Sequence, residues 1–122
     1  MIRGILAAVA VAALSLAVAS TAFGRPSTSR TLNGSVGPGF TITLKQRGKL
    51  VKTLKPGTYK FVIADKAPIH NFELDGPHGL AKTFSSVPFT GMKTVTLKLK
   101  AGKYKYYCKP HEATMFGRFT VK

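Results

Sequence analysis

Acidic residues are scarce in this sequence. Its 122 residues include 4 Asp and Glu against 19 Lys and Arg, which gives a formal net charge of +15. Chemistry that needs clustered carboxylates is therefore disfavoured, including glycoside hydrolysis by paired acids, magnesium-dependent phosphoryl transfer and EF-hand calcium binding. Any catalytic or metal-binding site must therefore be built mainly from side chains other than carboxylates.

Cysteine is nearly absent as well, since Cys108 is the only one, and the chain has no tryptophan. A single cysteine cannot form an intramolecular disulfide framework. The apolar content of 44% is too high for a disordered chain, and the length suits one domain with one core. We therefore expect one folded domain that is stable without disulfides.

The first 22 residues have the features of an export signal. Arg3 precedes an uncharged run at residues 4–24, and small residues at 17–22 offer A-x-A-like cleavage sites. An uncleaved membrane anchor is the alternative, since the apolar run approaches the roughly 20 residues that span a bilayer. We expect a signal peptide or anchor at residues 1–22, a polar linker at 23–31 and the folded domain at 32–122. This organisation predicts a location in the periplasm or on the extracellular face of the cell envelope.

The rest of the chain alternates between apolar and polar residues with a period of two. Such runs begin near Phe40, Tyr59, Thr94, Lys103 and Arg118, and Gly or Pro residues lie between them. Because strand side chains point to opposite faces in turn, the apolar member of each pair, Phe40 included, should face the core. With no helical repeat after residue 24, the pattern predicts an all-β sandwich of about seven or eight strands.

Potential metal ligands gather in one loop near the C-terminus. Cys108, His111 and Met115 follow one another as Cys-x2-His-x3-Met, and His70 stands far upstream. Sulfur donors together with imidazole nitrogen select copper, and two His with one Cys and a weak axial Met form a blue-copper electron-transfer site. Zinc is the alternative, although one thiolate and a Met are unlike a structural zinc site. The set predicts one copper ion that cycles between Cu(I) and Cu(II).

Two further residues of ligating types are not expected to bind the metal. His78 lies in a Gly-Pro-His-Gly turn and should be exposed. Met92 follows a glycine and should lie in a loop or in the core.

These motifs resemble those of the cupredoxins, most closely the plastocyanin, amicyanin and pseudoazurin group. Residues 102–111 read like the group's G-x-Y-x-[FY]-x-C-x-P-H, and residues 115–121 read like its M-x-G-x-[VF]-x-V. The resemblance implies a Greek-key β-sandwich around a type 1 copper site. The implied ligands are His70, Cys108, His111 and Met115.

The resemblance also implies supporting roles around the metal. His111 would sit at the surface as the point where electrons enter and leave. Asn71 would brace the ligand loops through hydrogen bonds, and Pro110 would stiffen the loop beside the cysteine. Lys109 stands where plastocyanins often have a small hydroxyl residue, so Asn71 is expected to bond only to backbone.

Together these features predict a carrier of single electrons between redox partners outside the cytoplasm, and not an enzyme. The excess positive charge points to an acidic redox protein or an anionic cell surface as partner. A copper chaperone or store, and a basic surface-binding module, are the alternatives. No nucleic-acid-binding motif is present, membrane contact would come only through the N-terminal segment, and we expect a monomer.

Overall fold

The computed structural model describes residues 10, 12–17 and 30–122. The expected signal peptide and linker therefore lie largely outside the described residues. Among the residues that are described, no helix is both long and apolar enough to cross a membrane.

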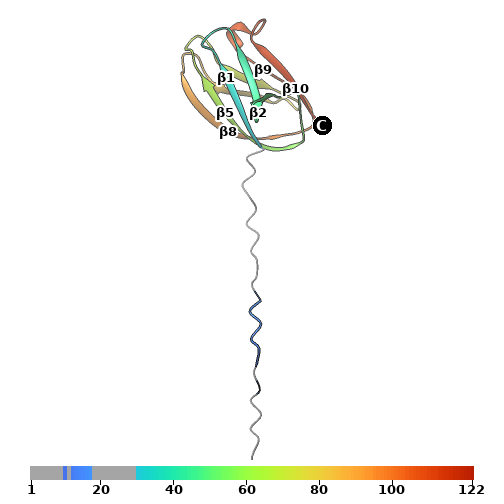
Figure 1. The fold of residues 1–122 in the computed structure, drawn as a ribbon. Coiled ribbons are helices and arrows are strands. Elements are labelled where there is room, and N and C mark those ends of the chain that lie inside the picture. Colours follow the sequence, from blue (N-terminus) through green and yellow to red (C-terminus); the bar gives the residue numbers. More distant parts are fainter. Residues whose placement is uncertain (1–9, 11, 18–29) are drawn as a thin grey trace, which may run out of the picture.

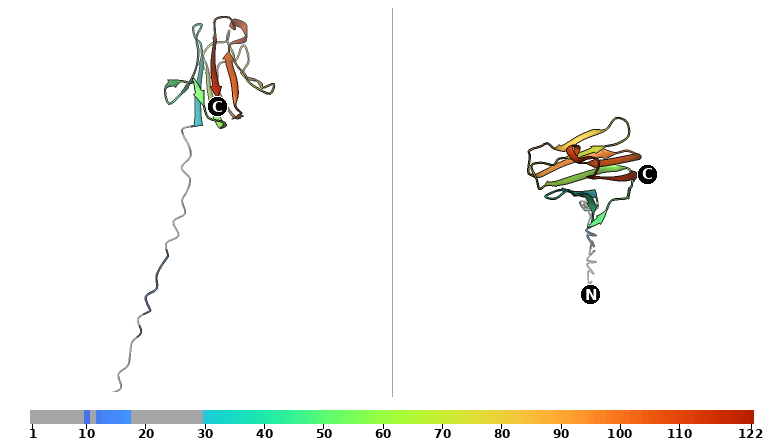
Figure 2. Two further views of the ribbon diagram at one scale, coloured as in Figure 1. Left: turned by 90° about the vertical axis from the view of Figure 1, so that its right-hand side faces the viewer. Right: turned by 90° about the horizontal axis from the view of Figure 1, so that it is seen from above.

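The domain is a β-sandwich, as predicted, with two sheets of five strands each (Figure 1). The first sheet has the order β3-β2-β1-β5-β8 and the second the order β4-β10-β9-β6-β7. Two views at right angles show the layers of the sandwich and the domain end that carries the helical turn at Lys109–His111 (Figure 2). The strands are β1 (Thr31–Val36), β2 (Ile42–Gln46), β3 (Lys49–Leu50), β4 (Thr53–Leu54), β5 (Gly57–Asp65), β6 (Phe72–Asp75), β7 (Ala81–Ser85), β8 (Gly91–Leu99), β9 (Gly102–Tyr107) and β10 (Phe116–Val121).

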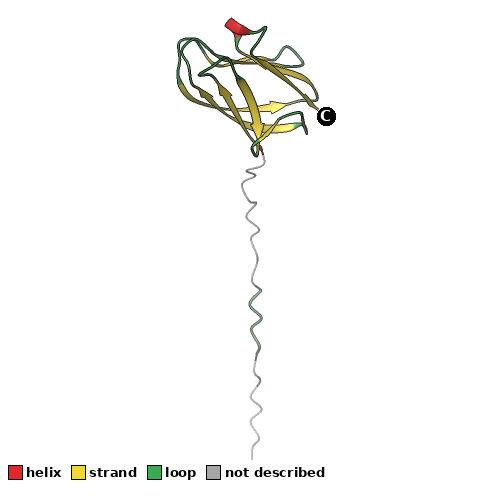
Figure 3. Cartoon of the chain, turned by 45° about the horizontal axis from the view of Figure 1, so that its top comes forward, coloured by secondary structure: helices red, strands yellow, loops and turns green. Residues whose placement is uncertain are grey.

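The described domain has ten strands, more than the seven or eight expected. The difference comes from the shortest elements, because β3 and β4 contain two residues each. A two-residue strand has no room for an alternating pattern that could reveal it. A 3-10 turn, η2 (Lys109–His111), lies between β9 and β10 and stands out from the strands in Figure 3.

The core lies between the sheets and is rich in aromatic side chains. On β5, Tyr59, Phe61 and Ile63 are buried, as their alternation predicts. Within the second sheet, Phe72 of β6 stacks on Tyr106 of the neighbouring strand β9 with ring centroids 5.8 Å apart, and both rings belong to the buried cluster. This packing fixes the relative position of β6 and β9, the two strands that adjoin the metal-ligand loops.

Two sequence-based placements are wrong. Phe40 does not face the core: it precedes β2 and is 62% exposed, because the Gly-Pro-Gly turn at residues 37–39 delays the strand until Ile42. Met92 lies neither in a loop nor in the core. It stands on the edge strand β8, opposite Ala64, and is 60% exposed.

Strand directions bring the ligand loops to one end of the sandwich. β1 and β5 run parallel, so the segments after them, residues 37–41 and 66–71, leave from the same end. β6 and β9 pair antiparallel, with Glu73 opposite Tyr107, so the start of β6 adjoins the end of β9. His70 and Cys108 are thereby neighbours, although they lie far apart in the sequence.

Candidate metal centre

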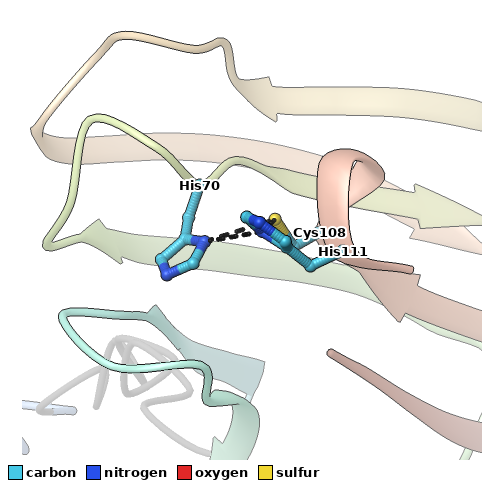
Figure 4. A group of neighbouring side chains, drawn as sticks. All are labelled: His70, Cys108 and His111. Carbon is cyan, nitrogen blue, oxygen red and sulfur yellow. Dashed lines mark hydrogen bonds between the residues drawn. The ribbon is translucent and has the colours of Figure 1, made fainter. Parts of the chain in front are cut away.

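Three of the predicted ligands point at one another (Figure 4). The Nδ1 atoms of His70 and His111 are 3.1 Å apart, and each lies 3.6 Å from Sγ of Cys108. His70 comes from the loop between β5 and β6, Cys108 directly follows β9, and His111 ends η2. The convergence that the sequence predicted for these three donors is confirmed.

The spacing of these atoms suits a single metal ion. Bonds from imidazole nitrogen or thiolate sulfur to a metal are roughly 2.0–2.3 Å long. Donor atoms that share one ion in a trigonal arrangement are therefore separated by about 3–4 Å, and the observed separations of 3.1 and 3.6 Å fall in that range. Two imidazoles and one thiolate are also the in-plane donor set of a blue-copper site.

Backbone hydrogen bonds hold the Cys108 loop in a compact form. The amide of Cys108 donates to the carbonyl of Met115 (3.0 Å), and the amide of Met115 donates to the carbonyl of His111 (2.8 Å). The amide of His111 in turn donates to the carbonyl of Cys108 (3.1 Å). These bonds close the loop on itself, so the positions of Cys108 and His111 are fixed by backbone and not by the metal alone.

The donors differ in their access to solvent. His70 and Cys108 are both 0% exposed, whereas His111 is half-buried. Nε2 of His70 is buried and has no hydrogen-bond partner among the described residues. If that nitrogen carries the ring proton, the Nδ1 lone pair is left free to face the metal. His111 is the one imidazole of the cluster that reaches the surface.

Asn71 connects the two ligand loops. Its Oδ1 accepts a hydrogen bond from the backbone amide of Lys109 (2.7 Å), and its Nδ2 donates to Oε1 of Glu73 (3.0 Å). The expectation that Asn71 bonds only to backbone is therefore wrong. Glu73 supplies the side-chain partner, and its other oxygen accepts from the hydroxyl of Thr83 (2.8 Å).

Phe40 is a contributor to the site that the sequence interpretation missed. Its ring meets His70 edge-on at a centroid distance of 5.3 Å and His111 at 5.0 Å. It therefore covers part of both imidazoles from the β1–β2 loop. The Gly-Pro-Gly stretch just before it was the available signal, because such a turn places the next residue outside a regular strand.

The other predicted residues are placed as follows. Met115 is 1% exposed and belongs to the buried cluster beside Cys108. Pro110 is exposed and lies in the middle of η2, where its missing N–H suits the first helical turn. His78 is exposed in a turn with φ of 58° and is not part of the donor cluster, as predicted.

A β-sandwich that holds two imidazoles and a thiolate around one point defines a blue copper protein. The comparisons with known proteins agree with this class. The family model for copper-binding proteins of the plastocyanin/azurin family matches residues 47–122. The chain therefore belongs to this family, it is a cupredoxin, and its cofactor is one copper ion.

Solved structures of rusticyanin share the fold. Reduced rusticyanin, solved by NMR, is 26% identical with a TM-score of 0.51, and a structure from a crystallographic study of two rusticyanin point variants gives the same values; each comparison covers 75% of this chain and 76% of the other. Another rusticyanin structure is 19% identical with a TM-score of 0.53 over the same shares. No curated protein matches the chain.

Proposed function

We propose that this protein carries single electrons between redox partners outside the cytoplasm. Copper, when bound, supplies the Cu(I)/Cu(II) couple. The observation that carries the proposal is the unequal exposure of the donors, since His70 and Cys108 are sealed while His111 reaches the surface. An electron therefore has one short route to solvent, through the His111 imidazole.

The protein residues supply rigidity and exclusion of water. Asn71 ties the His70 loop to the amide of Lys109, and the loop that carries Cys108 and His111 is closed by its own backbone bonds. A scaffold that keeps its donors in place through both oxidation states has little to reorganise during transfer. Rusticyanin, a structural relative, has been described in a reduced form, which supports a redox role here as well.

Met115 is proposed as the fourth, axial ligand. Its side chain is buried, and its backbone bonds to both Cys108 and His111 place the residue at the closing point of the loop. A thioether is a weak axial donor in sites of this kind. The three-residue spacing between His111 and Met115 is thus compatible with a closed loop around the metal.

A carrier fits this site better than an enzyme or a copper-delivery protein. Substrate turnover needs an open coordination position, and ready release of copper needs accessible donors. Here His70 and Cys108 are closed from solvent and Met115 is 1% exposed. The proposed partner is an acidic redox protein, because the chain carries a large excess of positive charge.

The optical spectrum of the copper-loaded protein tests the proposal. We expect an intense blue band with Cu(II) that a reductant bleaches reversibly. Cys108→Ala should abolish the band, since the coloured transition needs the thiolate. His78→Ala is the matched control for the histidines, because His78 is exposed and outside the donor cluster. A colourless wild-type complex, or an unchanged spectrum in Cys108→Ala, would overturn the assignment.

A further inference from the structure

Basic side chains line two hollows at the end of the domain opposite the metal centre. A hollow of about 430 Å³ is lined by Arg30, Arg47 and Lys55 together with Gln46, Thr53, Leu54 and Tyr59. A neighbouring hollow of about 450 Å³ shares the β2 and β4 ends and adds Lys49 and Lys52. We call these two hollows, with their five basic side chains, the basic groove.

The groove and the metal centre occupy opposite strand ends. Tyr59 lies near the start of β5, whereas the His70 loop follows its end. β5 has 9 residues. At about 3.3 Å per residue it separates the two regions by roughly 25 Å. A ligand in the groove therefore leaves His111 accessible.

Acidic side chains are absent from the lining of the groove. The one ion pair among the described residues joins Lys105 to Glu112 (2.9 Å), at the metal end. Glu73 and Asp75 lie on β6, which β9 and β10 separate from β4 in the sheet. Five basic side chains thus gather with no acidic side chain among the lining residues, and a bound anion would offset the electrostatic cost of bringing them together.

Arg30 is exposed, yet two contacts hold its guanidinium in place. Its guanidinium lies over the Tyr59 ring, 5.6 Å from the centroid, and against the backbone of Gly57, where an added Cβ would collide with it. The Tyr59 hydroxyl donates to the carbonyl of Lys55 (2.6 Å), which fixes that ring. The guanidinium is therefore oriented in advance, which lowers the entropy lost when it binds a ligand.

Arg47 provides a second, independent observation. It and Gly48 form the two-residue turn between β2 and β3, with φ of 51° and 77°. Such turns favour Asn, Asp or Gly at the first position, because other side chains are strained at positive φ. Arg47 holds this unfavourable backbone position and lines both basic hollows, which points to a binding role for its side chain.

We infer that the basic groove is a binding site for phosphate groups. Guanidinium groups bind phosphate oxygens through two parallel hydrogen bonds, and lysines add charge without fixed geometry. Arg30 and Arg47 would supply the forks, and Lys49, Lys52 and Lys55 the surrounding charge. Either a free phosphate anion or the headgroups of an anionic phospholipid membrane offer this chemistry. In the second case the protein would sit on the membrane with its metal end turned outward.

The test uses the copper-loaded protein in its reduced form, so that NMR signals are not broadened by Cu(II). Inorganic phosphate is titrated against chloride at matched ionic strength, and amide shifts are followed. We expect phosphate-specific shifts at Arg30, Gly48 and Lys55, with none at the metal loops. In parallel, sedimentation with neutral and with anionic phospholipid vesicles separates free phosphate from headgroups as the source.

Two double variants distinguish a site from overall charge. Arg30→Gln with Arg47→Gly should weaken phosphate or vesicle binding at least about tenfold, since two charge-assisted contacts are lost. Arg47→Gly relieves the positive φ, so loss of the fold is not expected to confuse the result. Lys66→Gln with Lys93→Gln removes the same charge from exposed positions near the metal end and should have little effect.

The inference is overturned if neither phosphate nor vesicles bind, or if both double variants weaken binding equally. The blue spectrum, which tests the proposed function, is independent of all these outcomes.

Discussion

Oδ1 of Asn71 accepts a hydrogen bond of 2.7 Å from the backbone amide of Lys109. This bond joins the residue after one ligand, His70, to the residue after another, Cys108. Asn71 is 5% exposed, so its bonds are made away from water. The two loops that supply the metal donors are thereby linked by protein alone.

Asn71→Ala should destabilise the domain by about 1–3 kcal/mol, because the Lys109 amide and Glu73 each lose a buried partner. The relaxed loops should also broaden or shift the copper spectrum. Urea unfolding and the optical spectrum measure the two effects. Thr83→Val is a useful control, since it removes the other donor to Glu73 without touching a ligand loop. If Asn71→Ala alters neither the spectrum nor stability beyond this control, the bond does not support the site.

Met115→Leu should keep much of the blue colour and raise the reduction potential. The colour depends on the thiolate, whereas the weak axial donor tunes the potential. Replacing a thioether by a hydrocarbon removes a donor that favours Cu(II), at nearly constant volume. Redox titration of the variant checks the shift. Met92→Leu is the matched control, because Met92 is exposed on β8 and should leave the potential unchanged. A potential that is the same in both variants would exclude Met115 as a ligand.

The sequence was sufficient for the fold class and for three converging donors because both follow from residue type and spacing. The alternation on β5 correctly predicted that Tyr59 and Phe61 are buried. The Cys-x2-His motif correctly predicted that Cys108 and His111 share one donor cluster. The placement of Phe40 could not be obtained in the same way. It has the alternation of a strand residue, and only the tertiary path of the turn at residues 37–39 takes it to the imidazoles.

Glu73 was not predictable as the partner of Asn71 for a related reason. The two are separated by one residue, which in a regular strand puts both side chains on the same face. Whether they bond depends on how β6 begins, and its pairing with β7 is irregular between Phe72 and Glu73. At this point the amide of Phe72 donates to the hydroxyl of Ser85 and the hydroxyl of Thr83 donates to Glu73, and no sequence pattern displays these contacts.

Gly117→Ala should destabilise the protein by about 1–3 kcal/mol through overpacking. A Cβ at this position on β10 would collide with the ring and hydroxyl of Tyr106, which is only 5% exposed. Thermal or urea unfolding measures the loss. Gly39→Ala is the matched control, since a Cβ there would meet nothing and its backbone needs no positive φ. Equal stability of the two variants would contradict the packing described for Tyr106.

Electron exchange with an acidic partner should slow as ionic strength rises, because screening weakens long-range attraction. Lys109→Gln should lower the rate at low salt and flatten the salt dependence, since Lys109 is exposed and lies two residues from His111. Lys98→Gln, on the exposed face of β8, is the control and should have a smaller effect. Stopped-flow rates against salt provide the measurement. Rates that do not depend on salt would mean that the positive charge does not attract the redox partner and serves only solubility.

Loss of the phenol proton of Tyr107 should lower the stability of the protein in alkaline solution. Burial, followed by the hydrogen bond that its hydroxyl donates to Asp75 (3.1 Å) and by the nearby carboxylates, raises the pKa of Tyr107 from 10.0 to about 12. The folded state therefore holds this proton more tightly than the unfolded state. Its contribution to stability is complete below pH 10 and is lost as the pH rises from there through about 12.

The comparison of wild type with Tyr107→Phe isolates this contribution, because the two proteins differ in no other side chain. Tyr107→Phe removes the hydroxyl and its proton but keeps the ring, on which Lys105 lies 5.3 Å from the centroid. The free energy of unfolding of the wild type should therefore fall more steeply with pH above 10 than that of the variant. Urea unfolding at a series of alkaline pH values measures both slopes. Parallel slopes would mean that folding does not raise the pKa of the Tyr107 phenol.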